Sequence, residues 1–218
     1  MYQKPKTAKR LFFDVIPKAA DEYFQHLAAY HGQDEAARIN NPVWYIHAGN
    51  PPQDSPPVSF ALLLNLVSAA NASDKSILWG FIENYADGAN PADNPVLDNL
   101  CEYAVRYYHD FVKPGKTYRA ANDQERKAMN DLAARLRSYD GDVKDAGDLQ
   151  TLVFSVGKDH SFENLRGWFQ ALYEVLLGQS QGPRFGSFIA IYGVKKTADL
   201  IPCCHPVQRD NCDIVIEI

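Results

Sequence analysis

The sequence has no uninterrupted apolar run long enough to cross a membrane. The run from Phe60 to Leu64 is far shorter than the roughly 20 apolar residues that a spanning helix needs. The basic residues at the amino terminus are not followed by the apolar segment of a secretory signal either. We therefore expect a cytoplasmic protein that does not contact a membrane, and its 46% hydrophobic residues predict a substantial folded core.

Cysteine is scarce, because the chain has only four, and they are too unevenly spaced for a disulfide scaffold. Cys203, Cys204 and Cys212 lie near His205 in the run CCHPVQRDNC, which offers ligand types that zinc accepts. The usual two-residue gap between paired cysteines is missing, and adjacent ligands strain tetrahedral coordination. We therefore predict no metal site and interpret residues 202–218 as an irregular tail, although DIVIEI within it is strand-like.

Positive charge is also limited, since the net charge of −5 argues against a general nucleic-acid binder. The basic residues are nevertheless grouped, whereas residues 73–102 are mainly acidic. Such a distribution suits an RNA partner that is held at a few basic positions and repelled elsewhere. The basic groups are formed by Lys4, Lys6, Lys9 and Arg10, by Lys113, Lys116 and Arg119, and by Arg184, Lys195 and Lys196.

Apolar residues recur with helical periodicity along most of the chain. This pattern predicts an all-α fold, arranged as a cage-like orthogonal array of helices that follows a short helical connector at the amino terminus. We place the boundary between connector and array near residue 41, where a Pro-rich segment begins. The expected helices cover residues 15–31, 34–39, a central helix from Pro57, 74–86, a long helix ending at Val112, 123–138, 145–157 and two within 164–193.

The stretch from Asn164 to Gly193 carries the clearest pattern. Its first half repeats apolar residues at helical spacing, so one face of that helix should pack against the core. Gly178 then stands where a helix C-cap is expected, and Pro183 stands where a second helix can start. Gln179, Gln181 and Arg184 cluster at this junction, which predicts a polar surface that contacts a ligand.

The run LYEVLLGQSQGPRFGSFIAIYG closely resembles the C-terminal anticodon-binding region of class I lysyl-tRNA synthetases. Three further segments agree in the same order: QKPKTAKRLFFDVIPKAADEY, NPVWYIHAGNPP and PPVSFALLLNLVSAAN. The resemblance extends from residue 3 to about residue 201. The two catalytic signatures of that family, HIGH and KMSKS, do not occur in this sequence, nor does the Rossmann fold that carries them.

The resemblance implies a division into residues 1–40, a connector that follows the catalytic core, residues 41–201, an α-helix cage that binds the anticodon, and residues 202–218 outside the match. It also implies tRNA(Lys) and the catalytic domain of the same synthetase as partners. ATP and lysine would bind that catalytic core, so we expect no cofactor and no aminoacylation from this chain alone. We expect a monomer.

Unpaired bases are recognised by stacking and by hydrogen bonds along their edges. A lysine anticodon is rich in uridine, whose edge offers carbonyl oxygens and one N–H. Arg184, Gln179 and Gln181 match these groups because arginine donates in a fork and glutamine both donates and accepts. Phe185 and Tyr192 are candidates for stacking, although their helical spacing favours burial.

The basic groups are candidates for contacts with tRNA phosphates. They comprise Lys4, Lys6, Lys9, Arg10, Lys113, Lys116, Arg119, Lys195 and Lys196. The first four residues are equally consistent with a solvated terminus. Trp44 and His47 could contact a base, but we favour a structural role for both.

Two other classes of function stay open. His109 and Asp110 are adjacent, as in the all-helical HD-type metal-dependent phosphohydrolases, with His47 and either Asp145 or Asp148 as further ligands. A two-residue motif is common by chance, and His47 lies in a Pro-rich segment where that fold needs a helix. A freestanding helical interaction module is the other alternative.

Overall fold

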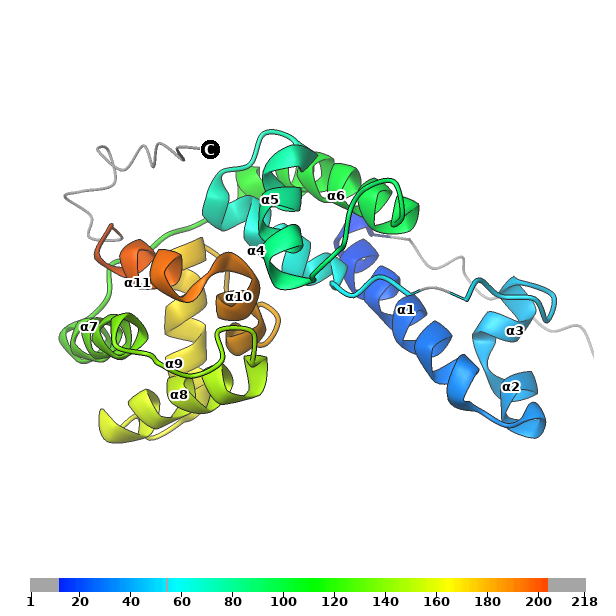
Figure 1. Ribbon diagram of the computed structural model, residues 1–218. Helices are drawn as coiled ribbons and strands as arrows, with labels where there is room; N and C mark the ends of the chain where they lie inside the picture. Colours follow the sequence, from blue (N-terminus) through cyan, green and yellow to red (C-terminus); the bar gives the residue numbers. More distant parts are fainter. Residues whose placement is uncertain (1–11, 54, 204–218) are drawn as a thin grey trace, which may run out of the picture. The chain divides into compact units, whose positions relative to one another are not determined.

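A computed structural model describes residues 12–53 and 55–203, and within these ranges the chain forms eleven α-helices and no strand (Figure 1). The predicted all-α fold is therefore confirmed. The chain divides into two compact units, Met1–Pro56 and Pro57–Ile218. The division falls at the end of the Pro-rich segment, whereas the sequence placed the boundary at its start, near residue 41.

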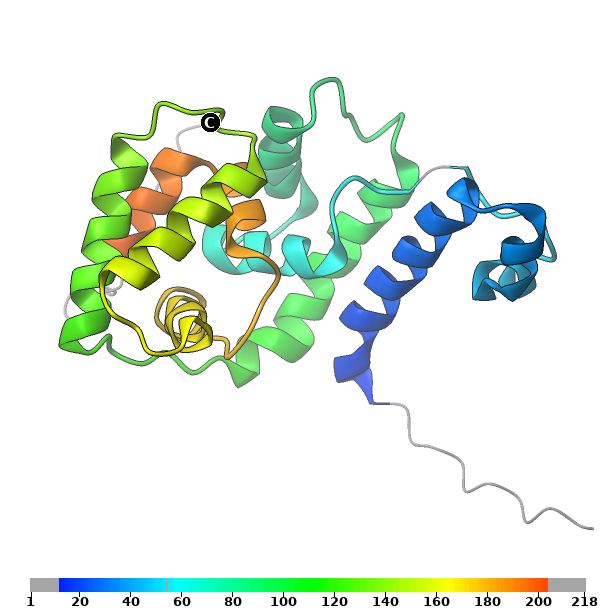
Figure 2. The ribbon, with the colours of Figure 1, turned by 90° about the horizontal axis from the view of Figure 1, so that it is seen from below.

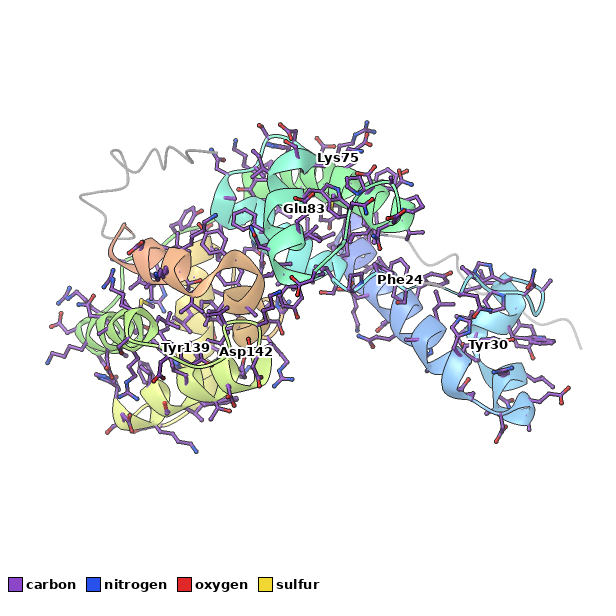
Figure 3. The ribbon with its side chains drawn as sticks, in the orientation of Figure 1. Phe24, Tyr30, Lys75, Glu83, Tyr139 and Asp142 are labelled. Atoms are coloured by element: carbon purple, nitrogen blue, oxygen red, sulfur yellow. The ribbon has the colours of Figure 1, made fainter. Side chains whose placement is uncertain are left out.

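The first unit consists of one long helix that is followed by two short helices. Its core consists of Leu27 and Tyr30 from the long helix and Val43 from the last short one. Figure 3 labels Tyr30 near the carboxyl end of α1, facing the two short helices. Asp34 and Asn41 cap these short helices by accepting hydrogen bonds from backbone N–H groups. The elements are a 3-10 turn at Phe13–Val15, α1 (Ile16–Gly32), α2 (Glu35–Asn40) and α3 (Pro42–Ile46).

Helix α3 explains why the first unit extends beyond residue 41. Val43 is fully buried against α1, so the start of the Pro-rich segment belongs to the first unit. The hydroxyl of Tyr23 lies 2.8 Å from Nε2 of His47, and Trp44 packs against Gly49. These contacts agree with the structural role that the sequence favoured for Trp44 and His47.

The amino-terminal half of α1 departs from the expected pattern. Tyr30 and Leu27 are buried, but Ile16 is exposed, so the apolar face of this helix is not buried along its first turns. Asp14 lies in the preceding 3-10 turn, and Val15 stands at the N-cap without a side-chain hydrogen bond. A periodic sequence pattern identifies a helix face but cannot show how much of that face finds a partner.

The second unit contains the remaining helices, and their bounds agree closely with the predicted ranges. The helix expected from Pro57 begins at Phe60 because Ser59 caps it, accepting a hydrogen bond from the N–H of Leu62. The elements are α4 (Phe60–Ala70), α5 (Lys75–Tyr85), α6 (Pro95–Tyr107) with a π-helical turn (Tyr108–Val112) and a 3-10 turn (Lys113–Gly115), α7 (Asp123–Arg137), α8 (Ala146–Asp159), α9 (Leu165–Leu172) with a π-helical turn (Tyr173–Leu177), α10 (Phe185–Tyr192) and α11 (Val194–Cys203).

Helix α4 is central to this unit, as predicted. It contacts α5, α6, α10 and the π-helical turn after α9, and its large apolar residues from Phe60 to Val67 are buried. Burial of a leucine or phenylalanine side chain contributes about 1.5–3 kcal/mol each, so this helix is a major source of stability.

Figure 3 shows Lys75 and Glu83 on the neighbouring α5 and places Tyr139 beside Asp142 in the loop that follows α7.

Helix α10 crosses α8 at very short range (Figure 2). A β-carbon on Gly186 would meet the carbonyl of Ala146 and would lie 2.5 Å from the backbone nitrogen of Gln150. The Gln150 side chain turns toward the same point, and its Oε1 accepts a hydrogen bond of 2.8 Å from the N–H of Gly186. This contact fixes where α10 begins.

We predict that Gly186→Ala destabilises the protein by about 1–3 kcal/mol, because the added methyl group must push two backbones apart. Gly167→Ala is the matched control, since Gly167 lies within α9 with open space around it. That control should stabilise α9 by up to about 1 kcal/mol, the difference in helix propensity between the two residues. Urea unfolding of both variants measures this, and equal midpoints would contradict the close crossing.

Candidate nucleic-acid interface

The junction between α9 and α10 is built as the sequence predicted at its start. The π-helical turn after α9 ends at Gly178, which has the left-handed conformation of a C-cap, with φ of 68°. Helix α10 begins at Phe185, two residues after the predicted start at Pro183. Arg184 is its N-cap residue, and its carbonyl accepts hydrogen bonds from the N–H groups of Ser187 and Phe188.

Tyr173 holds the segment between the two helices in place. Its hydroxyl donates a hydrogen bond to the carbonyl of Pro183, and its backbone carbonyl accepts one of 3.2 Å from the N–H of Gln179. Any side chain at Gly182 would overlap the Tyr173 ring. Burial raises the pKa of the Tyr173 hydroxyl, so this group stays protonated and continues to donate.

Two adjoining pockets lie along this segment, and together we call them the recess. Both are lined by Arg166, Phe169, Tyr173 and Gly182. The first, the glutamine pocket, has a volume of about 300 Å³ and is completed by Gln170, Ser180 and Gln181. The second, the phenylalanine pocket, has a volume of about 400 Å³ and is completed by Gln150, Phe154, Leu165, Pro183, Arg184 and Phe185.

The recess presents positive charge. Arg166 and Arg184 are exposed, and neither guanidinium group has a hydrogen bond or ion pair with any residue in the described part of the chain. The nearby acid Glu174 is already paired, because its carboxylate accepts hydrogen bonds from Arg119 and Gln170. Both arginines can therefore bind an anionic or carbonyl-rich ligand.

The predicted anticodon contacts divide between this recess and the core. Arg184 and Gln181 are exposed and line the recess. Gln179 is half-buried and lines neither pocket, and its side-chain nitrogen is buried without a hydrogen-bond partner. The stacking roles predicted for Phe185 and Tyr192 need correction: their side chains are only 0% and 5% exposed.

The reason for this correction is the packing of α10 in the core. Tyr192 stacks on Phe188 and Phe81, with ring centroids 5.1 and 5.3 Å away, so both of its faces have aromatic neighbours. Phe185 packs against Tyr173 and Phe188. The helical spacing had favoured this burial, and the structure places both rings accordingly.

Sequence reasoning missed several residues of the recess, among them Arg166, Phe154, Phe169, Gln170 and Ser180. Phe154 and Phe169 form an edge-to-face pair with ring centroids 4.9 Å apart, and Phe154 is 37% exposed. Phe154 falls outside the buried stripe of α8, so a signal was present: a large aromatic residue on the polar face of a helix. Phe169 was assigned only to packing, and nothing in the sequence distinguished Arg166 from other surface arginines.

Lys116 is held inside the second unit. Its ammonium group donates to the hydroxyls of Ser68, Tyr108 and Tyr118, and it lies over the rings of both tyrosines. These contacts join the segment after α6 to α4 and to the π-helical turn that begins at Tyr108. Lys116 therefore has a structural role, and its contact with a phosphate stays a prediction.

Arg119 is engaged by two carboxylates. It donates two hydrogen bonds to Glu125, of 2.7 and 2.8 Å, and one of 2.5 Å to Glu174. Glu125 is buried and also completes the capping box of α7 with Asn122. The hydrogen bonds from Arg119 lower the pKa of both carboxyl groups. Arg119 thus joins α7 to the turn after α9, and its contact with a phosphate stays a prediction.

The other basic candidates differ in availability. Lys113, Lys195 and Lys196 are exposed, and the ammonium group of Lys196 lies 4.4 Å from the centroid of the Phe81 ring. The remaining candidates, Lys4, Lys6, Lys9 and Arg10, lie outside the described residues, as do Cys204, His205 and Cys212 of the CCHPVQRDNC run.

The structure offers no metal centre for the phosphohydrolase alternative. Within residues 12–53 and 55–203, no three His, Cys, Asp or Glu side chains are grouped so that they could hold a metal ion. Asp145 caps α8 by accepting hydrogen bonds from two backbone N–H groups.

Among the residues that the structure describes, no helix is both long and apolar enough to cross a membrane.

Comparison with known proteins identifies close relatives. The chain is 60% identical over 201 residues to a lysine–tRNA ligase of Roseobacter denitrificans. Over 203 residues it is 47% and 46% identical to lysine–tRNA ligases of Rickettsia felis and Rickettsia conorii. Each match covers 92% of this chain, which spans 38–39% of the length of these relatives. No family model matches. The predicted resemblance to lysyl-tRNA synthetases is thereby confirmed.

We predict that Arg119→Ala lowers the free energy of unfolding at neutral pH by about 2 kcal/mol, because it leaves the buried Glu125 carboxylate without its charged partner. The pKa values of Glu125 and Glu174 are lowered by folding, so this stabilisation is present above the unfolded-state value of about 4.3 and is lost as pH falls through the folded-state values.

Urea unfolding at a series of pH values measures the effect. The difference between the original protein and Arg119→Ala should shrink in acid. Arg126→Ala is the matched control, because Arg126 pairs only with the exposed Asp123 among the described residues and should cost under about 1 kcal/mol. A difference that does not change with pH would contradict the ionic role of Arg119.

Proposed function

We propose that this chain supplies the tRNA-selecting part of a class I lysine–tRNA ligase and reads the anticodon of tRNA(Lys) with the recess. The lysine–tRNA ligases that match 92% of the chain support this assignment. In this proposal the catalytic domain of the same protein binds ATP and lysine, and the chain itself neither binds a cofactor nor aminoacylates. We further propose that it acts as a monomer in the cytoplasm.

The observation that carries the proposal is the exposed guanidinium group of Arg184 at a fixed backbone position. Its carbonyl accepts two hydrogen bonds from the first turn of α10, and the same turn is tied to α8 through the hydrogen bond from Gly186 to Gln150. Gln181 is presented by the same short segment. Preorganised donors and acceptors of this kind suit base edges, because binding then needs little ordering of the protein.

The charges of the second unit also support RNA binding by its carboxyl-terminal helices. Arg166, Arg184, Lys195 and Lys196 are exposed cations on or near α9, α10 and α11. The segment over residues 73–102 instead exposes acids such as Asp93 and Glu83, the latter labelled in Figure 3. Phosphates are attracted to the first group and repelled by the second, which orients the RNA before base contacts form.

We predict that Arg184→Ala weakens binding of tRNA(Lys) about tenfold, consistent with the 1–3 kcal/mol that a base-reading arginine contributes. The loss should be smaller for a tRNA(Lys) whose anticodon bases have been replaced, because that RNA has already lost the contact. Arg106→Ala removes an equal charge from an exposed position on α6 and serves as the matched control.

Equilibrium binding of the full chain at several salt concentrations measures these effects. An equal loss for both RNAs that diminishes at high salt would assign Arg184 to a phosphate instead of a base. If neither RNA binds, or if Arg184→Ala binds as the original protein does, the anticodon-reading function is contradicted and a helical interaction module becomes the better account.

A further inference from the structure

We infer that the recess seats two consecutive unpaired nucleotides and identifies only one of them. The base in the glutamine pocket is read through hydrogen bonds that separate uridine from cytidine, whereas the base in the phenylalanine pocket is held by stacking and by Arg184, which donates to a carbonyl that both bases share. This inference rests on the proposed function for the nature of the ligand, an anticodon loop. It goes further in assigning two subsites of different chemistry.

The glutamine pocket has the groups needed to read a base edge. Gln181 and Ser180 each offer a donor and an acceptor. The side-chain nitrogen of Gln170 donates to Glu174 at 2.6 Å, which fixes the direction of its amide group. Uridine presents two carbonyl oxygens and one N–H, whereas cytidine presents an amino donor in place of one carbonyl, so a uridine-to-cytidine change inverts part of the pattern.

Apart from Arg184, which suits a carbonyl that uridine and cytidine share, the phenylalanine pocket lacks this reading capacity. Phe154, Phe169, Leu165 and Pro183 supply apolar walls. The amide oxygen of Gln150, which also lines it, already accepts the hydrogen bond from Gly186. Stacking on an aromatic face contributes about 1–3 kcal/mol per base and tolerates any base, because each base has a π-face.

The two pockets are arranged for neighbouring nucleotides. They share Arg166, Phe169, Tyr173 and Gly182, so two bases in them would be separated by a single wall of side chains. Each volume, about 300 and 400 Å³, lies at the lower end of the range for small-ligand pockets. Arg166 borders both, and its guanidinium group suits the phosphate that links two nucleotides.

The segment from Gln181 to Arg184, the rim of the recess, passes from the glutamine pocket to the phenylalanine pocket. Gln181 precedes Gly182 and lines the glutamine pocket, while Arg184 follows Pro183 and lines the phenylalanine pocket. The hydrogen bond from Tyr173 to the Pro183 carbonyl holds the rim between these two side chains. The separation of reading and stacking is thus fixed by the backbone.

The test uses the full chain and RNA hairpins that carry the anticodon stem and loop of lysine tRNA. In one hairpin series, each anticodon uridine is replaced singly by cytidine. For the original protein, one replacement should weaken binding at least about fivefold, and a neighbouring replacement should change it less than about twofold, since only one base is read.

Two variants separate the pockets. Gln181→Ala should abolish the penalty for the sensitive uridine, because it removes the group that reads that base. Phe154→Ala should weaken binding of every hairpin by the same factor of about fivefold or more. Phe154→Trp keeps a stacking face and should restore binding, and Tyr103→Ala, which removes a 55% exposed aromatic from α6, should leave it unchanged.

The possible failures are distinguishable once thermal unfolding has confirmed that each variant folds. Binding that Arg184→Ala weakens but Phe154→Ala does not would overturn the two-nucleotide seat and leave the anticodon-reading function standing. The assignment of the pockets would be overturned by the opposite pair of results. In that case Phe154→Ala changes the preference for one base, and Gln181→Ala lowers the affinity for every hairpin equally. Hairpins that do not bind the original protein at all would overturn the proposed function as well.

Discussion

The contact between α8 and α10 at Gly186 is the constraint on which the recess depends. The two helices approach so closely that no side chain fits at this position, and the Gln150 amide bonds the N–H of Gly186 at 2.8 Å. The start of α10 is therefore fixed relative to α8, and with it the position of Arg184. Phe154 lies one turn after Gln150 on the same helix. The contact at Gly186 therefore sets the positions of both Phe154 and Arg184 in the recess.

Charge in this unit is used in two distinct ways. Lys116 and Arg119 form hydrogen bonds within the unit, and these bonds join the segment after α6 to α4, α7 and the turn after α9. Arg166 and Arg184 have no such partners among the described residues and remain exposed beside the recess. A protein with a net charge of −5 can thus present a cationic surface, because the local pairing of each arginine matters more than the total.

The sequence predicted the helices well because their signals are local. Capping residues such as Ser59 and Asp74 and the left-handed Gly178 mark helix ends through contacts a few residues away. The roles of Lys116, Arg119 and Phe154 depend on partners that are remote in sequence, and periodicity cannot reveal these. Short helices are similarly difficult to predict. Helix α3 begins at Pro42 within a segment that looked like a turn, and because it packs against α1, the first unit extends to Pro56 instead of ending near residue 41.

Hydrogen exchange of the full chain, with and without the anticodon hairpin, tests the central claim most directly, because it locates the RNA without any substitution. The account predicts that bound RNA slows exchange in the peptides from Asn164 to Ser187, which form the rim of the recess, and leaves those over residues 73–102 unchanged. Protection over residues 73–102 with none at the junction would contradict it.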